Sequence, residues 1–171
     1  TGEASTGNTG STGSTNTGST NTGTTNTNSG SVSASLATSQ PSGMIVAGQA
    51  GAVLANLNFS GNGSVTKVVL QRTGVSSDSL LTNVYLYEGN KRITDAASVT
   101  TGGYVTFSSP SGLFAVNGSR TITVRADIAT SASLPSGVGQ AVGVKLNSMT
   151  VGGVESTYTN VMGNYLTVSG V

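Results

Sequence analysis

The sequence predicts an all-β protein, built as an antiparallel sandwich of two β-sheets. Apolar residues alternate with polar ones in many short runs, which is the period of a strand with one buried face. Turn residues separate these runs at intervals of about 8 to 12 residues, as in sandwiches and barrels. Glycine and β-branched residues are scattered too densely to leave a helical period. The short strands and regular turns therefore predict an immunoglobulin-like or jelly-roll arrangement.

The amino-acid composition alone excludes several classes of function. The chain has 171 residues, no Cys and no His, which removes thiol chemistry, the usual zinc sites and Ser-His-Asp triads. Charged residues make up only 8% of it and the net charge is +1, so it has no basic cluster for nucleic acid or an anionic membrane surface. No apolar run approaches the roughly 20 residues of a membrane span. We therefore expect a non-enzymatic exported protein without cofactor or metal, whose solubility comes from hydroxyl and amide side chains.

Residues 1–30 form a separate low-complexity tail rich in Thr, Ser, Asn and Gly. Their most apolar residue is Ala4, so they contain nothing with which to offset the entropy of ordering. Two interpretations stay open, a solvated spacer and an O-glycosylated stalk. Since the chain begins at Thr1 without a leader pattern, we expect either a processed mature protein or a piece of a larger one.

The predicted sandwich domain spans residues 31–171 and opens with three strands. The first contains alternating Val32, Ala34 and Leu36, and the second is a short apolar piece over residues 44–47. In the third, we expect one face to carry Val53, Ala55, Leu57 and Phe59 and the other to carry Leu54, Asn56 and Asn58. The Ser-Gly-Asn-Gly segment at residues 60–63 is predicted to end this strand as a hairpin turn.

Residues 65–95 look most like the folding nucleus, because two β-rich runs are followed by a tight turn at residues 88–90. This turn should fold residues 85–88 against 91–94 as a hairpin. Val84 and Leu86 alternate with Tyr85 and Tyr87, so we expect the aliphatic pair to be buried and the phenols to lie on the opposite face.

Further strands are expected at residues 97–100, 103–108, 113–116, 120–128, 142–146, 149–151 and 165–168, with a turn at 117–119 and a loop at 129–140. Alternation within them and within residues 84–86 predicts one core between two sheets. The residues assigned to this core are Val84, Leu86, Val105, Phe107, Ile122, Val124, Ala126, Ile128, Val142, Val144 and Leu146.

Three segments carry a resemblance to a known family, namely VTKVVLQRTGVSSDSLLTNVYLYEGNKRITDAASV, YVTFSSPSGLFAV and SRTITVRADIA. Together they resemble a repeat domain of large predicted cell-surface and surface-layer proteins of ultrasmall candidate-phylum bacteria. The resemblance covers roughly residues 31–168. It implies an extracellular, non-catalytic β-sandwich that builds a surface coat or appendage, and it supplies no functional residues.

The aromatic residues are the clearest hint of a binding site. Tyr85 and Tyr87 share a strand face, and we expect Tyr104 on a neighbouring strand. Such a patch is suited either to stacking on sugar rings or to packing at a protein interface. The remaining candidates are three glycosylation sequences of the type N-x-Ser/Thr, at Asn58, Asn62 and Asn117.

Two classes of function therefore stay open. The first is a structural subunit or segment of a surface layer or filament, which self-associates into a polymer or lattice. The second is a carbohydrate-binding or adhesion module that uses the tyrosines. For the first class, Val32, Ala34 and Leu36 are the candidate assembly strand, since a strand next to a long tail can complete a neighbour's sheet. The alternative is that this strand pairs within its own domain.

Overall fold

The computed structural model describes residues 31–170, and the predicted tail lies outside them. The described chain is all-β, as predicted, and its only helical segments are the 3₁₀ turns η2 (Asp78–Leu80) and η3 (Pro135–Gly137). Its strands are β2 (Val32–Leu36), β3 (Gly43–Val46), β4 (Ala52–Thr73), β5 (Leu81–Glu88), β6 (Lys91–Arg92), β7 (Tyr104–Ser108), β8 (Phe114–Ile128), β9 (Ala141–Val151), β10 (Val154–Thr157) and β11 (Leu166–Ser169).

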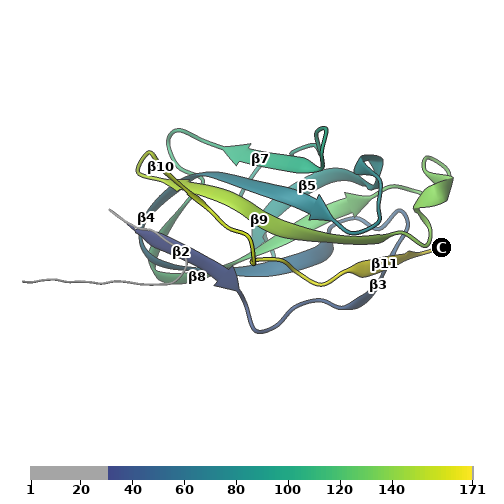
Figure 1. Cartoon of the computed structure of the whole chain (residues 1–171), viewed down its shortest axis with the longest axis horizontal. Coiled ribbons are helices and arrows are strands. Elements are labelled where there is room, and N and C mark those ends of the chain that lie inside the picture. Colours follow the sequence, from purple (N-terminus) through teal and green to yellow (C-terminus); the bar gives the residue numbers. More distant parts are fainter. Residues whose placement is uncertain (1–30, 171) are drawn as a thin grey trace, which may run out of the picture.

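One strand, β4, connects the whole hydrogen-bonded network (Figure 1). The sheet has the order β3-β11-β9-β4-β8-β5-β6, with β2 and β7 also paired to β4 and β10 paired to β9. The N-terminal part of β4 pairs with β2 and β8, whereas its C-terminal part pairs with β7 and β9. The predicted division into two sheets is therefore not confirmed, because β4 belongs to both halves. The sheet is also mixed rather than purely antiparallel, since β11 and β3 are parallel.

The predicted hairpin turn at residues 60–63 is wrong, because β4 continues through it as a 22-residue strand. The predicted turn at residues 117–119 is also part of a strand, and the two segments pair with each other, Gly61 opposite Gly118 and Asn62 opposite Asn117. Gly61 and Gly118 have φ angles of +122° and +101°. Only glycine adopts such angles without strain, so the residues that suggested turns instead allow two long strands to bend together.

A register shift in β4 changes the predicted faces near its start. The pairing with β8 skips a residue between Val53 and Ala55, as in a β-bulge. Leu54 is consequently fully buried beside Ala55, while Val53 is only partly buried. The expectation that Val53 shares a face with Ala55, Leu57 and Phe59 is therefore wrong, whereas these last three are buried together.

The predicted core is confirmed. All eleven residues assigned to it are buried, and Ile122, Val124 and Ala126 are fully so. Phe59 packs edge-on against Phe114 with ring centroids 5.1 Å apart, which ties β4 to the start of β8. Alternation found much of this core because its residues on β5 and β8 are separated by side chains that are exposed or only partly buried.

Smaller corrections concern strand ends. Residues 97–100 contribute two isolated bridges rather than a strand, and residues 141–151 form one continuous β9 rather than two pieces. Strand β10 was not predicted. The hairpin of β5 and β6 is confirmed, with Glu88 opposite Lys91 and Tyr87 opposite Arg92.

The two ends of the described chain lie at opposite ends of the molecule. In Figure 1, β2 begins near one end of the longest axis and β11 runs out at the other. Both terminal strands lie along this axis. The described chain therefore begins at one end of the domain and finishes at the other.

Candidate functional site

The best-defined candidate site is on the outer side of β5, β6 and β8. Val84 and Leu86 point into the core, and this directs Tyr85 and Tyr87 to the outer side of β5. Arg92 lies opposite Tyr87 on β6, and Arg125 lies opposite Tyr85 on β8, two residues before Asp127. We call Tyr85, Tyr87, Arg92, Arg125 and Asp127 the aromatic face.

The two rings of the aromatic face each hold one arginine. Tyr85 and Tyr87 pack edge to face, with centroids 6.2 Å apart and ring planes at 88°. The guanidinium carbon of Arg92 is 5.2 Å from the Tyr85 centroid, and that of Arg125 is 4.8 Å from the Tyr87 centroid. These are cation–π distances. Each phenol ring therefore has one side covered by a cation.

Asp127 completes the site by orienting Tyr85. One of its oxygens accepts a hydrogen bond from the Tyr85 hydroxyl at 2.7 Å and another from Asn83 at 3.4 Å, and its second oxygen accepts one from the Gly51 backbone N–H at 2.9 Å. Partial burial opposes ionisation, but the donors from Tyr85, Gly51 and Asn83 together hold the pKa of Asp127 below its usual value. The hydrogen bond to Asp127 is also the main reason that the pKa of Tyr85 is raised, and burial of the phenol adds to this rise.

Tyr104 is not part of this face. It lies on β7, which pairs with the C-terminal part of β4 opposite Gln71, and β7 is not a sheet neighbour of β5. Strand order decides this placement, and alternation carries no information about strand order. Alternation with Val124 and Ala126 directs Arg125 and Asp127 to the outer side of β8, but their contact with the tyrosines depends on the pairing of β5 with β8.

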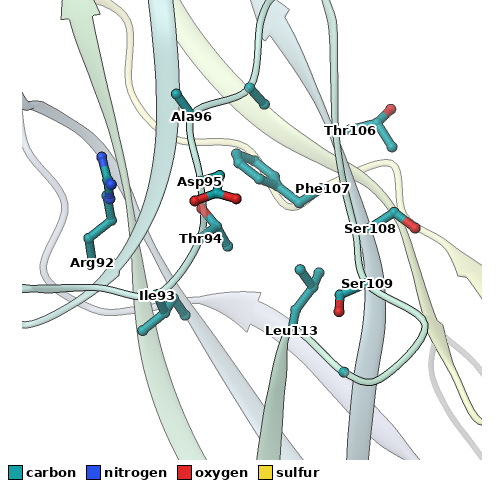
Figure 2. Close-up of a pocket in the computed structure, with 12 residues that line it drawn as sticks. Arg92, Ile93, Thr94, Asp95, Ala96, Thr106, Phe107, Ser108, Ser109 and Leu113 are labelled. Atoms are coloured by element: carbon teal, nitrogen blue, oxygen red, sulfur yellow. The ribbon is translucent and has the colours of Figure 1, made fainter.

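A groove of about 550 Å³ opens between the β6–β7 connection, β7 and the segment before β8. Figure 2 shows Thr94 and Asp95 on one side of it and Ser108 and Ser109 on the other. Phe107 and Leu113 also line it. Among the described residues that line it, Asp95 is the only carboxylate, so these residues do not include the pair of acids that glycoside hydrolysis uses.

Two further carboxylates form ion pairs. Asp78 pairs with Arg72 at 2.7 Å, and Glu88 pairs with Arg120. The bond from Arg120 lowers the pKa of Glu88. Within residues 31–170 no three His, Cys, Asp or Glu side chains gather as a metal site. Nor does any helix in that range have the length and apolar character to cross a membrane.

The candidate assembly strand lies in its own domain. Strand β2 pairs antiparallel with β4, with Val32 opposite Gly61, Ala34 opposite Phe59 and Leu36 opposite Leu57. Tyr158 lies near the other side of β2. Burial raises the pKa of its phenol, and the backbone N–H of Ala34 partly offsets the rise. Strand β4 is the strand that pairs with β2 in the described part of the chain.

The three glycosylation sequences lie on β4 and β8. The Asn58 side-chain oxygen accepts a hydrogen bond from the Thr121 hydroxyl at 2.6 Å, and this residue is only partly exposed. Asn62 and Asn117 are exposed and lie directly opposite each other. Of the three, these two leave their side chains accessible at one end of the sheet.

Comparison with known proteins supplies no family for this fold and face. No protein-family model matches the chain, and no curated protein matches it either.

Proposed function

We propose that this protein is a non-catalytic structural module of an extracellular assembly, a subunit or segment of a cell-surface layer or filament. The observation that carries the proposal is the position of the two chain ends at opposite ends of the longest axis (Figure 1). Modules with this geometry join in series without folding back on one another. The resemblance to repeat domains of surface-layer proteins supports the same assignment, as does a composition with only 8% charged residues.

In this proposal the two halves of the curled sheet act as the two layers of a sandwich, of immunoglobulin-like or jelly-roll type. Support comes from β4, whose N-terminal part pairs with β8 and whose C-terminal part pairs with β9. Inward residues of both halves, such as Ile122 and Leu146, belong to one core. A core of this kind gives a stiff module without disulfides.

Control of the sheet edges also supports assembly by defined contacts. An exposed edge strand invites uncontrolled pairing with other chains. At the β3 edge, the Val46 N–H donates to the Gln49 side chain at 3.0 Å, and the Gln49 N–H donates to the Val46 carbonyl at 2.9 Å. Since β2 is also paired with β4 over its whole length, we propose that modules join through their ends and lateral faces and that β2 stays in its own sheet.

The alternative, a module whose tyrosines stack on neutral sugars, is less well supported. A stacking platform presents bare ring faces side by side, whereas Tyr85 and Tyr87 are perpendicular and each carries an arginine. Tyr104 lies on a strand that is not next to theirs.

Electron microscopy of the purified protein tests the proposal. We expect ordered sheets or fibres at high concentration, and antibody labelling at the surface of intact cells. Dispersed monomers at every concentration, together with labelling confined to the cell interior, would overturn it.

A further inference from the structure

We propose that the aromatic face binds carboxylate groups of an acidic polysaccharide through Arg92 and Arg125. This goes beyond a structural role, because it assigns a ligand class to one face of the module. If the protein belongs to a surface assembly, as proposed above, the interaction would hold the module against an acidic glycan layer.

The distribution of charge is the first observation. The chain has only seven Lys and Arg residues, and its solubility comes largely from uncharged side chains. Two of the seven, Arg92 and Arg125, lie on one face of the β6–β5–β8 segment. The ion pairs within residues 31–170 involve Arg72 with Asp78 and Arg120 with Glu88. In the described part of the chain, Arg92 and Arg125 thus keep their charge without a carboxylate partner.

The second observation is that both guanidiniums are held in place. Cation–π pairs occur about once per 70 to 80 residues, yet two neighbouring pairs lie on this face and share an edge-to-face tyrosine contact. A ring beneath a guanidinium covers one side of its plane and leaves the edge with the two Nη groups for a ligand. This edge matches a carboxylate in a two-bond geometry. Because the cations are already ordered, binding loses less side-chain entropy.

The hydrogen bonding of Arg125 is the third observation. Its Nη1 donates to the Gly51 carbonyl over a long distance, 3.4 Å, so this weak bond competes little with a ligand oxygen. Its Nε is shielded from solvent, so a ligand would contact Arg125 through the two Nη groups. Asp127 is the one acidic group on the face, and its oxygens already accept from Tyr85, Asn83 and Gly51.

The surroundings suit an extended sugar polymer. Beyond Arg125, hydroxyl and amide side chains continue the outer surface, with Thr123 bonded to Asn56 and Thr121 bonded to Asn58. Such groups exchange hydrogen bonds with sugar hydroxyls. Nucleic acid is less favoured, since its affinity comes mainly from many phosphate contacts and this face offers two cations.

Affinity measurements with polygalacturonate, a chain of carboxylated sugars, test the inference. We expect the full-length protein to bind it at low salt and to leave neutral dextran unbound. The double variant Arg92→Gln/Arg125→Gln should lose at least about tenfold in affinity. Its matched control is Lys67→Gln/Lys145→Gln, which removes the same charge from β4 and β9 and should stay within about twofold of the natural protein.

A second variant separates specific from general attraction. Arg92→Lys/Arg125→Lys keeps the charge but loses the planar two-bond geometry, so its affinity should fall between those of the natural protein and Arg92→Gln/Arg125→Gln. If Arg92→Gln/Arg125→Gln and the control Lys67→Gln/Lys145→Gln lost the same affinity, the inference would be overturned. Failure of the natural protein to bind polygalacturonate would overturn it too. Tighter binding to a single-stranded oligonucleotide would overturn it as well.

Unfolding midpoints of all variants show whether a loss of binding reflects a loss of fold. Microscopy of the same samples keeps the two proposals apart. A protein that forms sheets or fibres but ignores polygalacturonate refutes only the glycan site. One that binds it through the arginines without assembling refutes only the structural role.

Discussion

At the scale of single residues, the pair Gly61 and Gly118 is what allows β4 and β8 to stay paired through a bend. Both have positive φ angles, but their surroundings differ. A Cβ on Gly61 would lie 2.1 Å from the Ser31 carbonyl oxygen, whereas a Cβ on Gly118 would meet nothing within 4 Å. Gly61 is therefore needed for both its conformation and its lack of a side chain.

Replacing Gly61 by Ala should consequently destabilise the protein much more than replacing Gly118 by Ala. Backbone strain alone costs about 1 kcal/mol or more at each position, and the clash with Ser31 adds to it only at Gly61. Urea unfolding of the two variants measures the difference. Equal losses of stability would mean that β2 moves away from Gly61 at little cost.

Asp127 should make the fold sensitive to acid. Its pKa is lowered in the folded state, so its stabilising effect is present above the unfolded pKa of about 3.9 and is lost as pH falls through the lower folded value. The urea midpoint of the natural protein should fall across that range, and Asp127→Asn should flatten the fall. Tyr85→Phe should flatten it in part, because it removes one donor to the carboxylate.

The matched control for this prediction is Asp95→Asn, at an exposed carboxylate on the β6–β7 connection. It should leave the acid-induced loss in place. Glu88, whose pKa is also lowered, should account for much of the loss that persists in Asp127→Asn. An acid profile unchanged by Asp127→Asn would contradict the assignment.

At the scale of strands, the sequence predicted faces well and continuity poorly. All eleven residues that alternation assigned to the core are buried, because burial on one side of a strand leaves a period of two. Gly and Asn at residues 60–63 and 117–119 suggested turns, because the sequence does not reveal that the two segments pair with each other. The face of Val53 was predicted wrongly for a similar reason, because the bulge there is defined by the pairing of β4 with β8. The aromatic face depended on the neighbour order of β5, β6 and β8, and only its tyrosines were found.

Truncation of the core should confirm how tightly these strands pack. Ile122 on β8 is fully buried and Leu86 on β5 is 1% exposed, so Ile122→Ala or Leu86→Ala should cost about 2–5 kcal/mol of unfolding free energy. Thr121→Ala, at an exposed neighbour that loses one hydrogen bond to Asn58, should cost about 1 kcal/mol. Similar losses for Ile122 and Thr121 would show that the faces of β8 are assigned wrongly.

At the scale of the whole molecule, the direction of the terminal strands matters most. Force between the chain ends would act along β2 and β11, which lie along the long axis (Figure 1). Such a force loads all the hydrogen bonds between β2 and β4 together. Force across the same pair would break them one after another.

Single-molecule stretching can compare these two directions, since the chain has no cysteine and tethers can be placed freely. Cysteines at positions 31 and 170 apply force along the strands, and cysteines at 31 and 62 pull β2 and β4 apart sideways. Forced rupture follows the unfolding rate, so we expect several-fold higher rupture forces for the 31–170 pair. Equal rupture forces for the two cysteine pairs would show that force along the strands does not load the hydrogen bonds between β2 and β4 together.

The sharing of β4 between both halves of the sheet implies how a row of such modules would lengthen. Neither half retains its central strand if the other loses it, so a module opens completely or not at all. Once opened, residues 31–170 would span at most roughly 460 Å when fully extended. A coat or fibre built from these units would yield in discrete steps, and each unit that opened would spare its neighbours from the load.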